Sequence, residues 1–505
     1  MSLTKVTYSM IAGSPVNVLD FGAVGDGVTD DTAAINAALA ASTCVYLPPG
    51  TYLHSSDILV KTGTTFYGAG WTSVLKHTSG GMTNGAVVVK GASESNLENV
   101  TVRNIKIEGS SSASGVFDGT DKGIYIKYAE HVTVDGVWVE KAGGEAVYAE
   151  ASGSGETEYI TFQNNYVSNS AFNAYNTNGL ILYGMITNNF AYDIGNFGFE
   201  GSGSDLIISG NIFNKFAGSA GISVGGWNSD TGYQRRTIIS NNKIMNGTNI
   251  SGSGIYMSDG ALGVLCEGNY ISNCAGRGIY ARYSGTLGHT NYSKQIVIQG
   301  NVLENNTGDA QILAASKNTL ITGNMVFTTL ATSCGIWAED PAGNATNIIE
   351  GNYVFGHTTD IKRDNVAYAY FGPNWVTSGY NAGDTQSKTF LFDKTTYATN
   401  GQSATSLRVQ QSGYFANVSS FMGNDVTSGS FDAVAYKNGS PVAGPIVTSS
   451  SASNVNGGSA DSDAFTFASG NIISAGVNAN AGPAAPGGPI TVSLTLNYYA
   501  PNSLV

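Results

Sequence analysis

The chain has 505 residues, of which 12% are charged, 42% are hydrophobic and 66 are glycine, and its net charge is −13. A disordered chain needs high charge and few apolar residues, and a coiled coil is rich in Ala, Glu, Lys and Leu, so both classes are excluded. The acidic balance also disfavours nucleic acid and anionic membranes as partners, because both select a basic surface. We therefore expect a turn-rich, all-β protein with a substantial core.

The first element predicted along the chain is a short helix over residues 32–40. Asp26, Asp30 and Asp31 precede it, and Asp30 or Asp31 lies where a helix N-cap belongs. We interpret this acidic cluster as structural rather than as a catalytic or metal site. Residues 1–48 then form an N-terminal lead-in and a capping helix, which covers the open edge of the β-structure that follows.

The cysteines predict buried free thiols rather than a metal site, because they are widely separated and make no paired CxxC pattern. They are Cys44, Cys266, Cys274 and Cys334. No other pattern predicts a bound metal or a cofactor. No stretch of about 18 apolar residues occurs, so we expect no insertion into a membrane.

A short pattern recurs within residues 49–372: an apolar residue, any residue, Gly or Asn, Asn, any residue and a second apolar residue. Its clearest asparagines follow one another at 22 to 32 residues, a repeat length typical of a solenoid. They are Asn165, Asn189, Asn211, Asn242, Asn269, Asn301, Asn324 and Asn352. The repeats contain short β-branched strands, and Gly and Asn tolerate the left-handed backbone of a sharp corner. We predict a parallel β-helix of about ten rungs whose corner asparagines hydrogen-bond along the shaft.

A second short strand, often Gly-Ile-Tyr, precedes most of these motifs and presents every other side chain outward. The outward row mixes aromatic rings, carboxylates and an arginine, a composition that suits sugar rings and hydroxyls. We place Ile181 and Glu200 in this row, and a long insertion over residues 225–236 beside it. The predicted substrate-binding residues are Tyr125, Tyr148, Trp227, Tyr256, Tyr280, Arg282 and Trp337. The alternative is a row of stacked rings that only stabilises the sheet.

The residues directly after the corner asparagines form a second and more apolar row. They are Tyr166, Phe190, Ile212, Lys243, Tyr270, Val302, Met325 and Tyr353. If they point inward, they belong to the core. If they point outward, an apolar row of this length is typical of a subunit interface.

The rung pattern ends near residue 372, and residues 373–390 have the Gly, Asn, Ser and Thr content of a linker. Residues 391–505 contain longer alternating strands, and Asn438-Gly439 predicts a hairpin turn. We predict a C-terminal β-sandwich, similar to a jelly roll, that serves trimerisation or contacts glycan.

The segment 17–35, with its runs Asp20-Phe21-Gly22 and Gly25-Asp26-Gly27, resembles the opening of the pectate-lyase-like superfamily of right-handed parallel β-helices. Residues 46–52 and 67–71 are similar to the first strands of that family. The lead-in over residues 5–16 resembles the linker that opens many bacteriophage tailspike depolymerases. The resemblance implies a homotrimer that acts on a bacterial capsule, O-antigen or exopolysaccharide. It also implies a location in the virion tail, joined to a tail or baseplate protein, or alternatively secretion.

Three carboxylates are the candidates for catalysis on such a substrate, because glycoside hydrolysis uses two carboxyl groups around the scissile bond. Glu200 and Asp259 are predicted two rungs apart, about 9.6 Å along the axis, and Asp230 belongs to the insertion between them. We predict that two of these three act as acid and base. Phe199 and Gly201 give Glu200 apolar surroundings, which favour the acid role.

Two other functions remain open. A polysaccharide lyase needs a cation to neutralise a uronate and a base to remove a proton, and Arg235, Arg236, Arg282, Tyr280 and His289 can supply these groups. A tail fibre or adhesin that binds glycan without cleaving it is the third possibility.

Overall fold

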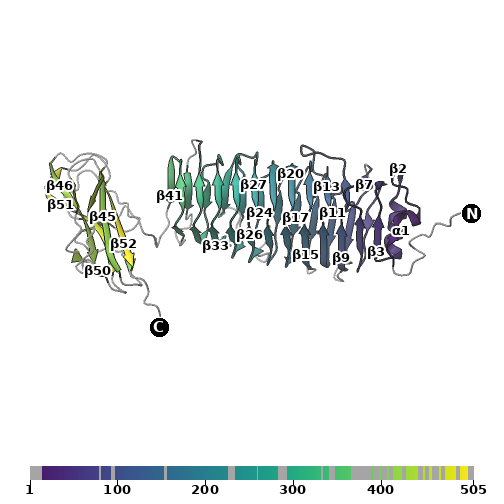
Figure 1. Cartoon of the computed structure of the whole chain (residues 1–505), viewed down its shortest axis with the longest axis horizontal. Coiled ribbons are helices and arrows are strands. Elements are labelled where there is room, and N and C mark those ends of the chain that lie inside the picture. The colour runs from purple at the N-terminus through teal and green to yellow at the C-terminus, as the bar shows by residue number, and fades with distance from the viewer. Residues whose placement is uncertain are drawn as a thin grey trace, which may run out of the picture. The chain divides into compact units, whose positions relative to one another are not determined.

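The computed structural model describes residues 14–78, 81–92, 97–152, 156–225, 234–258, 260–282, 293–330, 334–339 and 347–364, together with strands β42 to β52 beyond residue 387. The chain divides into two compact units, Met1–Ala367 and Tyr368–Val505. The first unit is a stack of short strands with helix α1 (Thr32–Ala41) at its N-terminal end (Figure 1). None of the helices in the described residues is long and apolar enough to cross a membrane.

Three parallel sheets build the first unit. Sheet A contains β1 (Val16–Asn17), β3 (Cys44–Leu47), β6 (Thr65–Gly68), β9 (Leu97–Arg103), β12 (Ala129–Asp135), β15 (Thr157–Gln163), β18 (Ile181–Leu182), β19 (Met185–Thr187), β22 (Ile207–Ser209), β25 (Gln234–Arg235), β26 (Ile238–Ser240), β29 (Ala261–Leu262), β30 (Leu265–Glu267), β33 (Lys294–Gln299), β36 (Lys317–Thr322) and β39 (Ile348–Glu350). Sheet B contains β2 (Asp26–Asp30), β4 (Gly50–His54), β7 (Ser73–His77), β10 (Lys106–Glu108), β13 (Trp138–Glu140), β16 (Tyr166–Ser168), β20 (Phe190–Ile194), β23 (Ile212–Phe216), β27 (Lys243–Met245), β31 (Tyr270–Ser272), β34 (Val302–Glu304), β37 (Met325–Phe327) and β40 (Tyr353–Phe355). Sheet C contains β5 (Ile58–Leu59), β8 (Val87–Lys90), β11 (Ile124–Lys127), β14 (Val147–Glu150), β17 (Tyr175–Asn178), β21 (Phe199–Gly201), β24 (Ala220–Val224), β28 (Ser253–Met257), β32 (Arg277–Ala281), β35 (Ile312–Ala314), β38 (Cys334–Glu339) and β41 (Thr359–Asp364).

The chain visits sheets A, B and C in turn, so each circuit adds one parallel strand to every sheet. This arrangement is the predicted right-handed parallel β-helix, and sheet C has twelve strands where about ten rungs were expected. Aligned apolar side chains from successive rungs fill the interior. Phe162, Ile186, Ile208 and Ile239 form one such column in sheet A, and all four are at most 1% exposed.

The corner between sheets A and B carries the predicted row of asparagine amides. Each Nδ2 donates to the Oδ1 of the next asparagine at 2.8–3.0 Å, from Asn165 through to Asn352. The same Nδ2 donates a second bond to a main-chain carbonyl of the preceding rung, as Asn242 does to Ile208 at 2.9 Å. Each amide from Asn165 to Asn324 is at most 2% exposed. The buried polar atoms of this asparagine ladder are therefore satisfied by neighbouring ladder amides and by main-chain groups together.

The left-handed residue of each corner lies directly before the ladder asparagine. Asn164, Asn188, Gly210 and Asn241 occupy this position in successive rungs, with φ values of 55–69°. Four glycines follow at 268, 300, 323 and 351. Gly and Asn are the residues that adopt this conformation at least cost, which explains their excess at these corners.

The N-terminal acidic cluster is structural, as predicted, although Asp31 does not cap the helix with its side chain. Asp30 Oδ1 accepts from Thr32 N at 3.0 Å, while the buried Asp31 carboxylate accepts from Val24 N and Gly25 N at 2.6 and 3.1 Å. Helix α1 packs against β3, β5 and the 3-10 helix η2 (Val18–Phe21), so it covers the first rung.

All four cysteines are free thiols, as predicted. Cys266, Cys274 and Cys334 are buried and Cys44 is half-buried. Burial raises the pKa of Cys266 and of Cys274 to about 12, so these two thiols stay protonated at neutral pH.

The second, more apolar row points outward from sheet B, which is the second of the two alternatives that the sequence left open. Tyr166 and Phe190 stack with centroids 5.0 Å apart, and Trp138 meets Tyr166 edge-on at 5.5 Å. Met325 and Tyr353 are 44% and 64% exposed. A continuous apolar strip therefore follows the outside of sheet B.

The second unit contains two antiparallel sheets in its described residues, in line with the predicted β-rich C-terminal domain. One contains β42 (Lys388–Phe390), β43 (Tyr397–Thr399), β44 (Leu407–Arg408), β46 (Ser428–Lys437), β47 (Ser440–Pro441), β48 (Val447–Ser449) and β51 (Ile472–Ala484). The other contains β45 (Gly413–Met422), β49 (Asn454–Gly457), β50 (Thr466–Phe467) and β52 (Ile490–Tyr498). Lys437 pairs with Ser440, and Asn438 has a φ of 53°, as the predicted hairpin requires.

Asn242→Ala is expected to lower the free energy of unfolding by about 3 kcal/mol, because it leaves several buried ladder partners unpaired. Its Oδ1 accepts from Asn211 N and Nδ2, and its Nδ2 donates to Ile208 O and Asn269 Oδ1. Urea unfolding followed by circular dichroism measures the change. Asn214→Ala is the control, since it removes only an exposed bond to Asn246 and should cost less than about 0.5 kcal/mol. Equal losses in the two variants would contradict the role of the ladder.

The fully buried His54 is expected to make the protein less stable in mild acid. Burial, together with the charge of His77, lowers the pKa of His54 from 6.5 to about 4. Between these values the unfolded chain binds a proton that the folded chain does not, so stability falls as the pH falls, by about 3 kcal/mol in total. The free energy of unfolding, measured from pH 7 to pH 4, should fall with pH in this way. In His54→Gln it should depend less on pH. The exposed His131→Gln serves as control, and a slope unchanged in His54→Gln would rule this origin out.

Candidate functional site

The outward face of sheet C carries a single column of side chains, because its strands pair in parallel register. The column reads Val88, Tyr125, Tyr148, Asn176, Glu200, Ser223, Tyr256, Tyr280, Leu313 and Trp337. It contains each described member of the predicted row except Ile181. That residue lies in β18 and pairs with Thr157 of sheet A, so its placement on sheet C was wrong. Asn176 of β17 occupies the position instead.

The two tyrosines of β11 and β14 are buried, with exposed fractions of 6% for Tyr125 and 7% for Tyr148. Their ring centroids are 5.7 Å apart. Tyr125 donates from its hydroxyl to Glu150 Oε2 at 2.9 Å, and Asn178 Nδ2 donates to the hydroxyl of Tyr148 at 3.2 Å. Burial raises the pKa of both phenols. These rings therefore form a packed floor with hydrogen-bonded hydroxyls rather than open stacking platforms.

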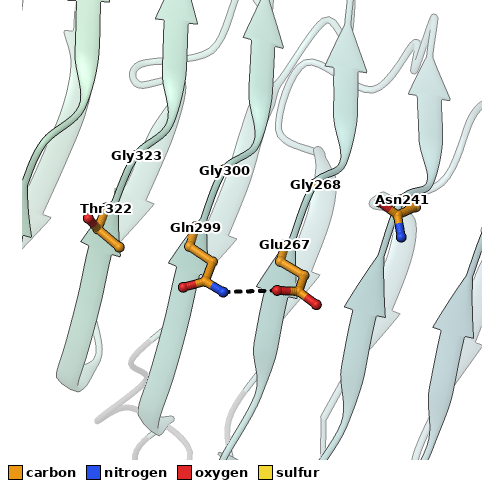
Figure 2. Close-up of a pocket in the computed structure, with 7 residues that line it drawn as sticks. All are labelled: Asn241, Glu267, Gly268, Gln299, Gly300, Thr322 and Gly323. Atoms are coloured by element: carbon orange, nitrogen blue, oxygen red, sulfur yellow. Dashed lines mark hydrogen bonds between the residues drawn. The ribbon is translucent and has the colours of Figure 1, made fainter.

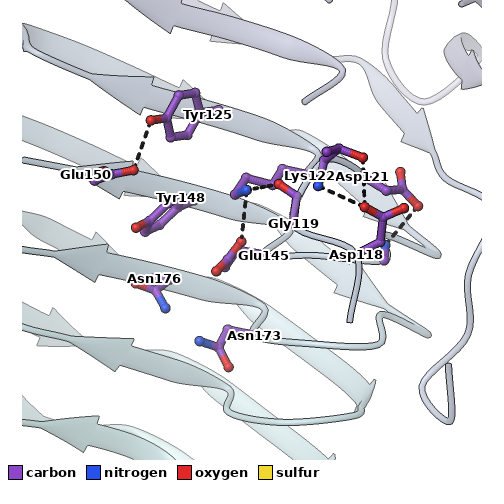
Figure 3. Close-up of polar contacts among 12 residues, drawn as sticks. Asp118, Gly119, Asp121, Lys122, Tyr125, Glu145, Tyr148, Glu150, Asn173 and Asn176 are labelled. Carbon is purple, nitrogen blue, oxygen red and sulfur yellow. Dashed lines mark hydrogen bonds and ion pairs between the residues drawn. The ribbon is translucent and has the colours of Figure 1, made fainter. Parts of the chain in front are cut away.

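A buried carboxylate, Glu145, lies where the chain enters β14. It is 8% exposed, and Lys122 Nζ forms an ion pair with its Oε2 at 3.5 Å. Lys122 also lies 5.7 Å from the ring centroids of Tyr125 and Tyr148 (Figure 3). Glu145 Oε2 makes no hydrogen bond to the described residues although it is buried. The ammonium group of Lys122 is therefore the charged partner of this enclosed oxygen.

Glu200 lies in β21, and two asparagine amides hold one of its oxygens. Asn173 Nδ2 donates to Oε2 at 2.7 Å and Asn176 Nδ2 donates to the same atom at 3.3 Å. Both asparagines belong to the β17 rung, one before the strand and one within it, and both are buried. The charge of Glu145 acts on Glu200, so the two carboxyls belong to one cluster.

The pKa values of the three carboxyls in this cluster are shifted in two directions, upward for Glu145 and Glu200 and downward for Glu150. Burial raises the pKa of Glu145 and that of Glu200, and for Glu200 the charge of Glu145 adds to the rise. Burial also acts on Glu150, but hydrogen bonds from Lys127 and Tyr125 and the charge of Lys127 outweigh it and lower its pKa. Environments that separate carboxyl pKa values in this way are typical of sites that perform acid–base chemistry.

Further along the column, a second group combines aromatic rings and guanidinium groups. Arg282 Nη1 donates to the hydroxyl of Tyr256 at 2.7 Å, and the Tyr256 and Tyr280 centroids are 5.5 Å apart. Arg277 stacks over Tyr280 at 4.5 Å and forms a two-bond pair with Asp309. Trp337 packs on the same side of the sheet and is half-buried. All four predicted residues of this region thus share one face of sheet C.

Four predicted residues lie outside the described residues: Trp227, Asp230, Asp259 and His289. Four polar residues of the cluster were missed by sequence reasoning: Lys122, Glu145, Asn173 and Asn176. Their only sequence signal is a polar residue within or just before a sheet C strand. Within the described part of the chain, no group of three His, Cys, Asp or Glu side chains is arranged to hold a metal ion.

A separate groove of about 430 Å³ lies at the corner between sheets A and B (Figure 2). It is lined by Asn241, Glu267, Gly268, Gln299, Gly300, Thr322 and Gly323. Gln299 Nε2 donates to Glu267 Oε2 at 2.9 Å along its wall. This corner contributes no residue to the carboxyl cluster on sheet C, so the two regions are distinct.

The chain belongs to the family described as rhamnogalacturonase A/epimerase, pectate lyase-like, whose sequence model matches residues 15–280. That match covers more than half of the chain and includes the whole carboxyl cluster. The names of its members are those of polysaccharide-modifying enzymes.

Individual relatives match different shares of the chain. Mannuronan C5-epimerase AlgE2 of Azotobacter vinelandii is 30% identical over 237 residues, which are 43% of this chain but only 23% of that protein. The A-module of Azotobacter vinelandii mannuronan C-5 epimerase AlgE4 matches with a TM-score of 0.54 and 21% identity, over 70% of this chain and 100% of that one. The Dettilon tailspike protein (gp208) matches with a TM-score of 0.54 and 15% identity, over 95% of this chain and 94% of that one. At these identities the two structures establish the fold alone.

Proposed function

We propose that this protein binds a bacterial surface polysaccharide on sheet C and cleaves it by glycoside hydrolysis. The observation that carries the proposal is the carboxyl pair formed by Glu145 and Glu200, with Lys122 and Asn173 as their partners. Glu145 lies just before β14 and Glu200 lies in β21, two strands further along sheet C. Inverting enzymes keep their two carboxyls apart so that a water fits between them.

Glu200 is the candidate acid. Its raised pKa keeps it protonated to higher pH than an exposed carboxyl, so it can protonate the glycosidic oxygen as the bond to the anomeric carbon breaks. Glu145 is the candidate base, because its ion pair with Lys122 favours the ionised form. It would take a proton from the water that attacks the anomeric carbon. Asp230 and Asp259 stay predictions for the same second role.

The remaining column positions supply contacts for neighbouring sugars. Tyr256, Tyr280 and Trp337 offer aromatic surface, and Arg282 offers a donor group, along the line of the same face. Trp227 stays a predicted contact. A polymer lying along the shaft would thus meet one outward side chain per rung.

The proposal includes a place in a bacteriophage tail as a homotrimer, or alternatively secretion as an enzyme. The lead-in over residues 5–16 and the fold shared with a tailspike protein support the first of these. The outward apolar strip of sheet B, which runs through Trp138, Tyr166 and Phe190, supplies a surface for neighbouring subunits. The capsule, O-antigen or exopolysaccharide of the host would be the receptor.

A lyase is the second candidate, and the contact between Arg282 and Tyr256 favours it. A guanidinium group beside a phenol places a cation near a possible base, as proton removal next to a uronate requires. The mannuronan-modifying relative acts by name on a uronic acid polymer, which is consistent with this alternative.

Glu200→Gln and Glu145→Gln should each reduce polysaccharide cleavage by about 10²–10⁴-fold, because each removes one partner of the acid–base pair. Size-exclusion chromatography of products from a panel of capsular and O-antigen polysaccharides measures the activity. Glu158→Gln, on sheet A, is the matched control and should leave cleavage unchanged. The rate of the unmodified protein should also fall above the raised pKa of Glu200, since the acid is then ionised.

Full activity in both amide variants would refute the hydrolase assignment. Products that absorb in the ultraviolet through a new double bond would identify the lyase. Binding without any fall in polymer length would identify a glycan-binding fibre or adhesin.

A further inference from the structure

Asn173 is the most constrained side chain in contact with Glu200. It is fully buried, and its Oδ1 accepts hydrogen bonds from Asn196 Nδ2 at 2.8 Å and from Phe197 N at 3.2 Å. Both partners are donors at these contacts, so the oxygen of the Asn173 amide must face them. Its Nδ2 is thereby directed at Glu200 Oε2, 2.7 Å away.

We propose that Asn173 is a positioning residue for Glu200, holding Oε2 so that Oε1 carries the proton delivered to the substrate. This inference rests on the proposed function. Both amide bonds go to Oε2, and Oε1 accepts no hydrogen bond from the described residues, so Oε1 is the oxygen left for the substrate. The amide of Asn173 thus decides which oxygen faces the glycan.

The charge environment of Glu200 allows the contribution of Asn173 to be measured. Glu145, which pairs with Lys122, is the charged group of the described residues that acts on Glu200. The column neighbours Asn176 and Ser223 are uncharged, and the phenols of Tyr148 and Tyr256 lie beyond them. A hydrogen bond donated to a carboxylate favours its ionised form, so Asn173 opposes the effects of burial and of Glu145 on Glu200.

Asn173→Asp is the sharpest test, because it keeps the acceptor for Asn196 and Phe197 and replaces only the donor. We expect kcat to fall about tenfold with KM changed less than twofold, as for an interaction used in the transition state. The high-pH limb, which is the alkaline range over which kcat/KM falls, should move to higher pH. The reason is that the carboxyl introduced at position 173 and the carboxyl of Glu200 then share a proton. Asn176→Asp, which loses the longer bond, should shift the limb less in the same direction.

Asn84→Asp is the matched control, because Asn84 Nδ2 donates to the Asp57 carboxylate at 2.8 Å away from this site. It should leave both kcat and the pH profile unchanged. A thermal melt of each variant shows whether the fold is retained.

Titration of ¹³C-labelled glutamate carboxyls by NMR gives a readout that needs no activity. The Glu200 signal is assigned by its absence in Glu200→Gln, and its pKa should rise in Asn173→Asp. If the pKa of Glu200 and the high-pH limb of kcat/KM are both unchanged in Asn173→Asp, the positioning role is overturned, even if kcat falls. Full activity in Glu200→Gln would instead overturn the proposed function, while the titration would still report on the contact itself.

Discussion

A buried row of asparagine amides sets the register on which the rest of the shaft depends. Each amide is paired only when the next rung is in phase, and an unpaired buried amide costs about 1–3 kcal/mol. A slip by one residue would break the bonds around each asparagine and turn every outward side chain inward. The ladder therefore fixes the alignment of the rungs that it joins, from Asn165 to Asn352, although its residues lie only at the corner between sheets A and B.

The site on sheet C is a consequence of that alignment. Register places Glu200 beside Asn176 and two strands from Tyr148, and the turns that enter the strands add Lys122, Glu145 and Asn173. The chain has few charged residues, yet one buried carboxylate, Glu145, and three half-buried charged residues, Lys122, Glu150 and Glu200, lie together on this face. Burial penalises each charge, and Lys122 and Asn173 offset part of that penalty. The cluster is therefore costly for folding, which is typical of residues retained for chemistry.

The fold could be predicted because its signals are local. The spacing of the ladder asparagines, the left-handed corner residues and the Asp30-Asp31-Thr32 helix start each occur within a few residues of sequence. The outward row on sheet C was also predictable wherever the strand reads Gly-Ile-Tyr. The prediction of this row was wrong at β17, because Tyr175–Asn178 lacks the Gly-Ile-Tyr pattern. The next segment, Gly179–Leu182, has a similar sequence but belongs to sheet A.

The polar partners of the site could not be predicted in the same way. Glu145, Asn173 and Lys122 precede their strands, and the path of a turn decides whether such a side chain points over the sheet or away from it. Tyr125 and Tyr148 were placed on the correct face, but their burial depends on the neighbouring Lys122 and Glu150, which sequence alone does not bring together. The sequence therefore predicts on which face of a strand a residue lies, but not which residues of neighbouring rungs it contacts.

The asparagine ladder also has a direction. Every Nδ2 donates toward the C-terminal neighbour and every Oδ1 accepts from the N-terminal one, so the amide dipoles add along the shaft. At the first end, Asn165 Oδ1 accepts from Val137 N at 2.9 Å; at the other, Asn352 Nδ2 returns to the carbonyls of Ile321 and Glu350. The two ends are thus chemically unlike. An additional rung bearing an asparagine can extend the asparagine ladder at its C-terminal end or be inserted within it. In either case its amide must point in the same direction as the others.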